Sequence, residues 1–258
     1  MLKRILATTS GGQVRSAFWQ AIQALPCTTN AKGSFDSALA FIKEIESETP
    51  TVRRLTLDCK EASATPIFKP GQWIDFHIPG MNEIGGFSIT SSPQQLADHN
   101  TLDLAIKEAG YPPARWVHEQ AQGLASAGNE QEADTAAGPG LKATLLYSAA
   151  SPNEFAFLSK LSQLVASTPS SLSMRLFVTG SSQEAQSSLL AQHCKFLQRR
   201  RIAVQDLEAA WTGLRMGCTQ EQRPLAFVCG PPGMTEAVNR CLLGLGLDAK
   251  DIRFEKWW

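Results

Sequence analysis

Phe227-Val-Cys-Gly-Pro-Pro-Gly-Met234 is the stretch that decides the fold. Its first residues continue the apolar segment Pro224-Leu-Ala226. Residues 224–229 thus form a short apolar run that is typical of a buried strand. Gly230-Pro-Pro-Gly233 stops this run, and apolar residues then return at helical spacing, which predicts a strand, a tight turn and a helix. Because ligands of an open α/β sheet bind at the carboxyl ends of its strands, Cys229 would stand at the floor of such a crevice.

The last residues of the chain predict a second strand beside the first. Residues 251–254 form a short strand-like run, and Trp257 and Trp258 follow close behind it. For Cys229 alone an alternative is open, in which it is a small buried hydrophobe and the prolines merely stop a strand. The aromatic end of the chain favours the site over this alternative.

Together the two motifs resemble the ferredoxin-NADP reductase superfamily, and within it the NAD-binding oxidoreductases of the mitochondrial OXNAD type. The resemblance covers about residues 50 to 258. It implies a set of site residues: Cys229, beside the nicotinamide, and Glu255 as catalytic residues, and Gly230, Pro231, Trp257 and Trp258 as cofactor-binding residues. For the two tryptophans, packing of the C-terminus against the first domain is the alternative.

The composition excludes several classes of protein. The chain has 258 residues, of which 43% are hydrophobic and 19% charged, and its formal net charge is zero, so nothing points to a nucleic-acid partner. No apolar stretch has the length of a membrane span. The six cysteines include no C-x-x-C pair and form no spaced set with the four histidines, which argues against zinc, iron–sulfur and disulfide frameworks and predicts no metal site.

The N-terminal residues 1–35 contain four basic residues and no acidic one. Apolar residues between Val14 and Leu25 fall on one helical face, and serine and threonine are frequent around them. This is the profile of a mitochondrial presequence, so we predict a mitochondrial protein. The alternative is an ordinary amphipathic helix packed on the body of the protein.

Four short strands at the spacing of a small barrel are predicted next, within residues 51–58, 68–80, 87–93 and 102–107. Pro70-Gly-Gln72 and Gly86 to Pro93 resemble the flavin-binding barrel of the same superfamily, which implies an incomplete barrel of this type at residues 48–118. The residues that the resemblance assigns to the flavin are Phe87, Ser88, Ile89 and Thr90. A polar strand edge is the alternative for this segment.

The flavin motif departs from the family pattern R-x-Y-S at one position. Phe87 and Ser88 match its end, but Gly85 stands where the family has the arginine that neutralises the diphosphate. Because a charge-assisted hydrogen bond contributes about 1.5–3 kcal/mol, its loss implies roughly ten- to a hundredfold weaker diphosphate binding. Lys107 and Arg115 are the candidates to replace it.

Residues 119–141 consist mainly of small and polar residues, as in a linker. The family would place further barrel strands here, and then the first strand of the nucleotide domain with its Gly-rich loop. That loop presents backbone N–H groups to the pyrophosphate, and losing two or three such bonds costs about 3–6 kcal/mol. The sequence thus resembles a reductase with an internal deletion.

The predicted second domain, residues 142–258, alternates strands with helices, as in a parallel sheet with crossover helices. Strands are expected at residues 143–148 and 173–179, and helices after the capping box at Ser151 and at residues 184–198 and 206–214. The resemblance gives Ser148 to the adenosine ribose, and a plain turn hydroxyl is the alternative. Arg199 to Arg201 predict a basic helix end, with nucleotide phosphate binding as the alternative.

The sequence therefore predicts a two-domain α+β protein. An antiparallel flavin-binding β-barrel precedes an α/β, Rossmann-like nucleotide-binding domain that lacks its first strand and Gly-rich loop. The resemblance implies a flavin-dependent oxidoreductase that passes a hydride from NAD(P)H to FAD, and electrons on to an unknown acceptor. The gap and Gly85 leave an alternative, a non-catalytic truncated variant that binds one cofactor or neither.

Overall fold

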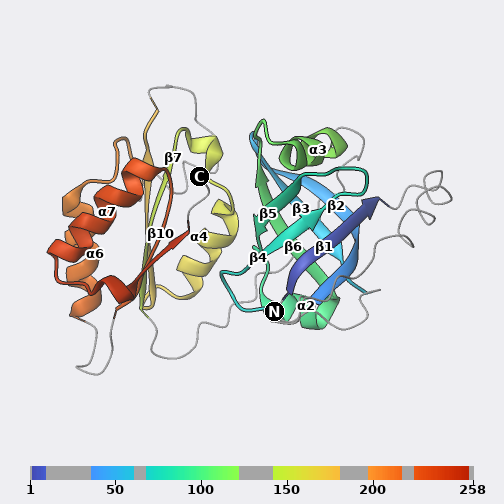
Figure 1. Cartoon of the computed structure of the whole chain (residues 1–258). Helices are drawn as coiled ribbons and strands as arrows, with labels where there is room; N and C mark the ends of the chain where they lie inside the picture. The colour runs from blue at the N-terminus through green and yellow to red at the C-terminus, as the bar shows by residue number, and fades with distance from the viewer. Residues whose placement is uncertain are drawn as a thin grey trace. The chain divides into compact units, whose positions relative to one another are not determined.

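The computed structural model describes residues 2–9, 36–60, 68–121, 142–180, 197–216 and 224–255. The chain divides into two compact units, residues 1–130 and 131–258 (Figure 1). Each unit has a core of its own, as expected of domains that fold around separate hydrophobic centres. None of the described helices is long and apolar enough to cross a membrane.

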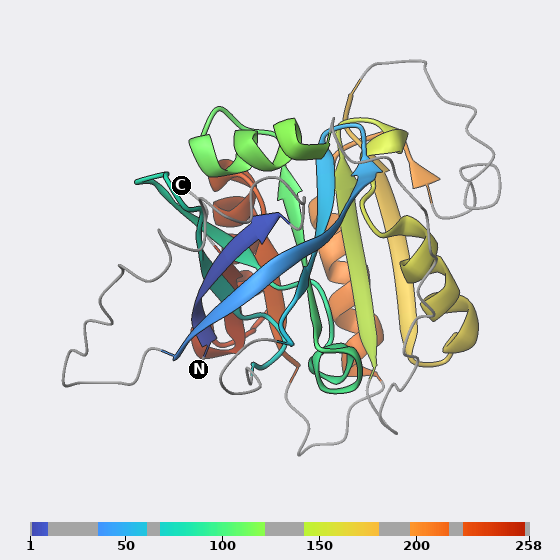
Figure 2. The same ribbon diagram turned by 90° about the vertical axis from the view of Figure 1, so that its right-hand side faces the viewer.

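The first unit is built on a six-stranded sheet with the strand order β5-β4-β1-β2-β3-β6. Its strands are β1 (Leu2–Thr9), β2 (Asp36–Thr49), β3 (Val52–Asp58), β4 (Trp73–His77), β5 (Ile84–Ser88) and β6 (Thr101–Lys107). Strand β1 runs parallel to β2 and β4, and the other pairs are antiparallel (Figure 2). A bridge between Ile89 and Leu104 joins the end of β5 to β6, so the two outer strands of this order meet.

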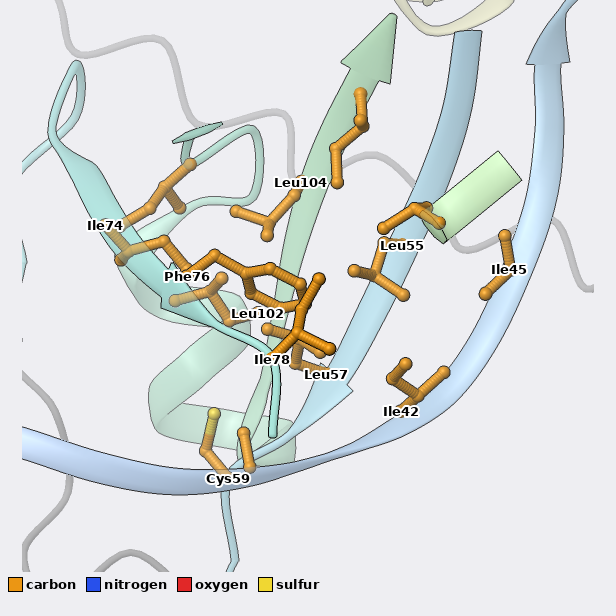
Figure 3. Close-up of a cluster of buried hydrophobic side chains, with 14 of the residues drawn as sticks. Ile42, Ile45, Leu55, Leu57, Cys59, Ile74, Phe76, Ile78, Leu102 and Leu104 are labelled. Carbon is orange, nitrogen blue, oxygen red and sulfur yellow. The ribbon is translucent and has the colours of Figure 1, made fainter. Parts of the chain in front are cut away.

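The core of the first unit follows from the alternation of its strands. Ile74 and Phe76 on β4, and Ile78 directly after it, point inward and are almost fully buried, while Trp73 is 46% exposed. The inward side chains of β2, β3 and β6 complete the cluster (Figure 3). Because successive side chains of a strand point to opposite faces, a sequence with every second residue apolar gives this one-sided core.

In the part of the first unit that the structure describes, two helices pack on the sheet. Helix α2 (Pro93–His99) begins at Ser92, whose hydroxyl accepts a hydrogen bond from the backbone N–H of Gln95 at 3.1 Å. A serine before the first turn satisfies one of the unpaired N–H groups of a helix start. Helix α3 (Pro112–Ala121) packs with Ala114 and Val117 on the core and continues into the start of the predicted linker.

The described strands of the second unit form two parallel sheets. The first contains β7 (Ala143–Ala149), β8 (Leu172–Val178) and β9 (Leu197–Gln198), and the second contains β10 (Ala226–Cys229) and β11 (Ile252–Glu255). Its helices are α4 (Leu158–Ser167), α6 (Val204–Arg215) and α7 (Pro232–Gly244), with short 3-10 turns at Pro152–Glu154 and Ala249–Asp251. Helix α4 packs on β8 and α7 on β10, while α6 packs against α7 (Figure 1).

The two sheets of this unit have separate cores. Phe155, Leu158 and Leu176 belong to the cluster between α4 and β8, and Val228 and Leu242 belong to the cluster between α7 and the pair β10-β11. Apolar residues at helical spacing in α4 and α7 therefore meet apolar residues at every second strand position.

Most strands of the second unit confirm the sequence prediction, including the strand, turn and helix around Cys229 and the strand near the end of the chain. Three other predictions are wrong. Ser151 forms no side-chain cap, because α4 begins only at Leu158. Leu197–Gln198 form a strand, and the remainder of the predicted helix 184–198 lies outside the described residues. The basic residues 199–201 end no helix, because they connect β9 to α6.

Candidate functional site

The first part of the candidate site lies on β5, in the first unit. Phe87 pairs with Ile74 and Ser88 with Trp73 across the β4-β5 ladder. The ring of Phe87 stands edge-on to Phe76, with 5.7 Å between the ring centroids, and it is only partly buried. The four predicted flavin-binding residues thus follow one another on β5 and its continuation, where Ile89 is buried in the core and Thr90 is exposed.

Gly85 allows this position of Phe87. A Cβ atom at Gly85 would lie 2.4 Å from Cε2 of Phe87 and 3.0 Å from Cβ of Pro113. Separations under 3.0 Å are not tolerated without movement, so any side chain here would push the phenyl ring aside. The space of the family's arginine is filled by Phe87 and by the start of α3.

The start of α3 is a weak place for a phosphate. A helix start attracts anions because its first N–H groups are unpaired, but Pro112 and Pro113 carry no N–H group. Tyr111 fixes this end, with its hydroxyl donating to the carbonyl oxygen of Ile84 at 2.9 Å. Of the two candidate cations, Lys107 ends β6 and is exposed, and Arg115 is exposed with a long ion pair to Glu119 at 3.8 Å.

The second part of the candidate site lies at the carboxyl ends of β10 and β11. Cys229 and Glu255 are register partners in the parallel ladder, so the two predicted catalytic residues end neighbouring strands side by side. Cys229 is exposed and not in a disulfide, and Glu255 is half-buried. Trp257 and Trp258 lie outside the described residues.

The turn after Cys229 is held by two residues of α7 that the sequence prediction missed. Thr235 is 3% exposed, and its hydroxyl lies 3.1 Å from the carbonyl oxygen of Gly230 and 3.2 Å from that of Pro231. The methyl group of Met234 would lie 2.0 Å from a Cβ atom at Gly230, so this glycine lets the thioether cover the turn. The sequence signal for this contact is a threonine in the first turn of the predicted helix.

Ser148 stands apart from this edge, in the other sheet. It is the second-last residue of β7, half-buried, and is paired in register with Phe177 of β8. The guanidinium group of Arg200 lies 5.3 Å from the ring centroid of Phe177. Arg200 also donates two hydrogen bonds to Asp206, at 2.5 and 2.8 Å, which lowers the pKa of that carboxyl group from its ordinary value.

Phe227 marks an uncovered face of the second sheet. It lies within β10, yet it is 79% exposed, because the side chains that face α7 are those of Val228 and its alternate neighbours. Within the described residues no strand pairs with the outer edge of β7 or of β10. In a sheet of parallel strands both faces are ordinarily covered by helices.

Comparisons with known proteins agree with this arrangement. No family model matches the chain. The chain is similar to oxidoreductase NAD-binding domain-containing protein 1 of Xenopus laevis, with 31% identity in an alignment that covers 83% of this chain and 77% of the relative. It is 30% identical to the Xenopus tropicalis protein of that name, over 85% of this chain and 79% of the relative.

Two solved structures share the fold. One is the flavohem-like FAD/NAD-binding domain of nitric oxide dioxygenase from Vibrio cholerae, with a TM-score of 0.56 and 16% identity over 84% of this chain and 97% of that one. The other contains the CS-b5R domains of human Ncb5or in its NAD+ form, with a TM-score of 0.53 and 14% identity over 84% and 68%. At these identities the likeness shows the fold alone, a mixed α/β arrangement of ferredoxin-reductase-like domains.

Proposed function

Because the chain belongs to the family of oxidoreductase NAD-binding domain-containing protein 1, we propose that it is a flavin-dependent NAD(P)H oxidoreductase. In this proposal a hydride passes from NAD(P)H to FAD, and electrons go on to a separate acceptor. The observation that carries it is the pairing of Cys229 with Glu255 at the ends of two parallel strands, just before a tight turn. Such strand ends are where nucleotide cofactors bind in α/β sheets.

The residues of β5 fit the ring of a flavin better than its diphosphate. Thr90 is exposed while its backbone N–H is tied to Asp103, so its hydroxyl is held outward on a fixed backbone. Phe87 offers a partly exposed ring beside Ser88. A bound flavin supplies the link between a two-electron donor and the acceptor. With Gly85 in place of the arginine, the protein would bind it reversibly.

In the second unit, at the carboxyl ends of β10 and β11, Cys229 and Glu255 would contact the nicotinamide. An exposed thiol at a strand end can pack against a flat ring and exclude water from it, while the rigid turn after it keeps it in place. The carboxylate of Glu255 would accept a hydrogen bond at the same edge. Ser148 would bond the adenosine ribose.

One observation favours a second candidate function. The separate sheets and the exposed Phe227 are what an α/β domain without its first strand and helix would display. Such a chain would be a non-catalytic member of the family that binds one cofactor or neither. We keep the mitochondrial location as a proposal on the basic, acid-free residues 1–35.

A steady-state assay separates the two functions. The full chain is supplied with FAD, NADH or NADPH, and an artificial electron-accepting dye. We expect dye reduction, and we expect Cys229→Ala to lower kcat by about tenfold, because a misplaced nicotinamide reacts more slowly, while flavin affinity stays unchanged. Cys241→Ala, on the far end of α7, is the matched control. Absence of dye reduction by the unmodified chain would support the non-catalytic alternative.

A further inference from the structure

Asp103 is a buried carboxylate to which the proposed function gives no role. It lies in the middle of β6 and is 2% exposed. Burying an ionised carboxylate costs free energy unless hydrogen bonds and charges compensate it. The partners that compensate Asp103 therefore show what it holds in place.

Both carboxylate oxygens of Asp103 accept hydrogen bonds. The hydroxyl of Thr56, on β3, donates to Oδ1 at 2.8 Å, and the side-chain amide of Gln95, on α2, donates to Oδ2 at 3.0 Å. Arg54 interacts with the same carboxylate through its positive charge. The side chain of Asp103 thus ties the sheet to the first turn of α2.

The backbone of Asp103 holds the segment that follows β5. Its carbonyl oxygen accepts the N–H of Thr90 at 2.8 Å, and its own N–H donates to the hydroxyl of Ser91 at 3.0 Å. Gln95 in turn donates its backbone N–H to Ser92. One buried residue therefore fixes both the end of the candidate flavin segment and the helix start behind it.

We propose that Asp103 is the positioning residue of the candidate flavin-binding segment Phe87–Thr90. The inference rests on the proposed flavin binding. Asp103 acts through its backbone bonds to Thr90 and Ser91 and its side-chain bond to Gln95 rather than by touching the cofactor, because its side chain is buried. Side chains that contact a ligand bind well only when a supporting layer of hydrogen bonds fixes them.

The test exchanges donor and acceptor within one hydrogen bond. In Asp103→Asn the new amide presents a donor where the carboxylate presented an acceptor. Gln95 can then bond it only by turning its own amide over, which gives up its donation to the hydroxyl of Thr101, while Thr56 can still donate to the remaining oxygen. Adding Gln95→Glu supplies an acceptor again and keeps the net charge. The matched control is Asp98→Asn, an exposed aspartate on the same helix that also accepts from a glutamine, Gln94.

Two readouts are measured on the full chain. The first is amide hydrogen exchange without flavin, at Thr90, whose N–H donates to Asp103, and at Gln95, whose N–H donates to Ser92, with Leu55 and Leu57 in the β3-β6 ladder as reference positions. The second is the dissociation constant for FAD from flavin fluorescence. We expect Asp103→Asn to speed exchange at Thr90 and Gln95 alone and to weaken FAD binding by about tenfold, and the double variant to restore both.

Several outcomes would overturn the proposal. One is equal acceleration of exchange in the reference ladder, which indicates a general loss of stability, and another is unchanged exchange at Thr90. If Asp103→Asn does not fold, the same two readouts are measured on Ser91→Ala. This substitution removes only the hydrogen bond from the backbone N–H of Asp103 to the Ser91 hydroxyl, and the same outcomes decide. Should the unmodified chain bind no FAD, the proposed function fails, whereas the exchange at Thr90 still decides whether Asp103 holds the segment.

Discussion

Gly85 shows how one residue changes the flavin site. Because a Cβ atom here would meet the ring of Phe87 at 2.4 Å, we expect Gly85→Ala to lower the free energy of unfolding by about 1–3 kcal/mol, the cost of overpacking. Urea unfolding followed by circular dichroism measures it.

Gly110→Ala is the control for this substitution, since no atom lies within 4 Å of a Cβ built there. We expect its effect to stay within about 0.5 kcal/mol. In a double-mutant cycle, Phe87→Leu should absorb part of the cost of Gly85→Ala, because it removes the colliding ring. A Gly85→Ala protein as stable as the unmodified chain would show that Phe87 does not occupy this space.

The lowered pKa of Asp206 predicts how the stability of the second unit depends on pH. Its hydrogen bonds from Arg200 lower its pKa, so the folded state holds the proton less tightly than the unfolded chain does. The carboxylate therefore adds stability above about pH 4, the ordinary range of an aspartate, and that contribution is lost as the pH falls through the lower folded pKa.

The measurement is the difference in Tm between the unmodified chain and Asp206→Asn as a function of pH. The difference in Tm should be largest at neutral pH. It should shrink in acid, because protonated Asp206 and the asparagine are both neutral. The exposed Glu208→Gln, on the same helix, is the control. A difference that persists undiminished in strong acid would contradict the role given to Arg200.

Single residues could be predicted from the sequence only where a motif specifies them. Phe87, Ser88, Cys229 and Glu255 are candidates that the resemblance names, and the strands that carry the last two were predicted to run side by side. Asp103 could not be found, because a polar residue at an alternating strand position is ordinarily expected to face water. Its burial depends on Thr56, 47 residues away in the sequence, and on Gln95 of the helix before its strand.

The turn between β10 and α7 depends on Thr235. Thr235→Val keeps the shape of the side chain and removes the hydroxyl that bonds the carbonyl oxygens of the turn, so we expect a loss of about 1 kcal/mol in unfolding free energy. Thermal unfolding measures it, with the exposed Thr212→Val on α6 as control. Equal effects of the two substitutions would mean that the hydroxyl does not hold the turn.

Elements with a strong local signal could be predicted, and those shaped by distant contacts could not. Strand β3 has the alternation of a half-buried strand, and the turn before α7 has its prolines and glycines. Strand β2 was missed, because its acidic residues suggested only a change of composition. The helix after Ser151 was placed too early, since Phe157 takes a left-handed backbone conformation, with φ of 60°, directly before α4.

The division into two units could be read from the sequence as a change from short strands to alternating strands and helices. The division of the described strands of the second unit into two sheets could not be predicted, because alternating strands and helices indicate a single parallel sheet. Strand β1 could not be predicted, because a basic segment without acids has the composition of a presequence.

The central claim is that the chain takes electrons from NAD(P)H into a bound flavin. The most direct measurement is the visible absorption spectrum of the full chain, recorded anaerobically with FAD and again after NADH or NADPH. The account predicts that protein in excess binds the flavin, shifting its spectrum, and that at least one of the two nucleotides bleaches it. A bound flavin that stays oxidised with both nucleotides, or a spectrum identical to that of free FAD, would contradict it.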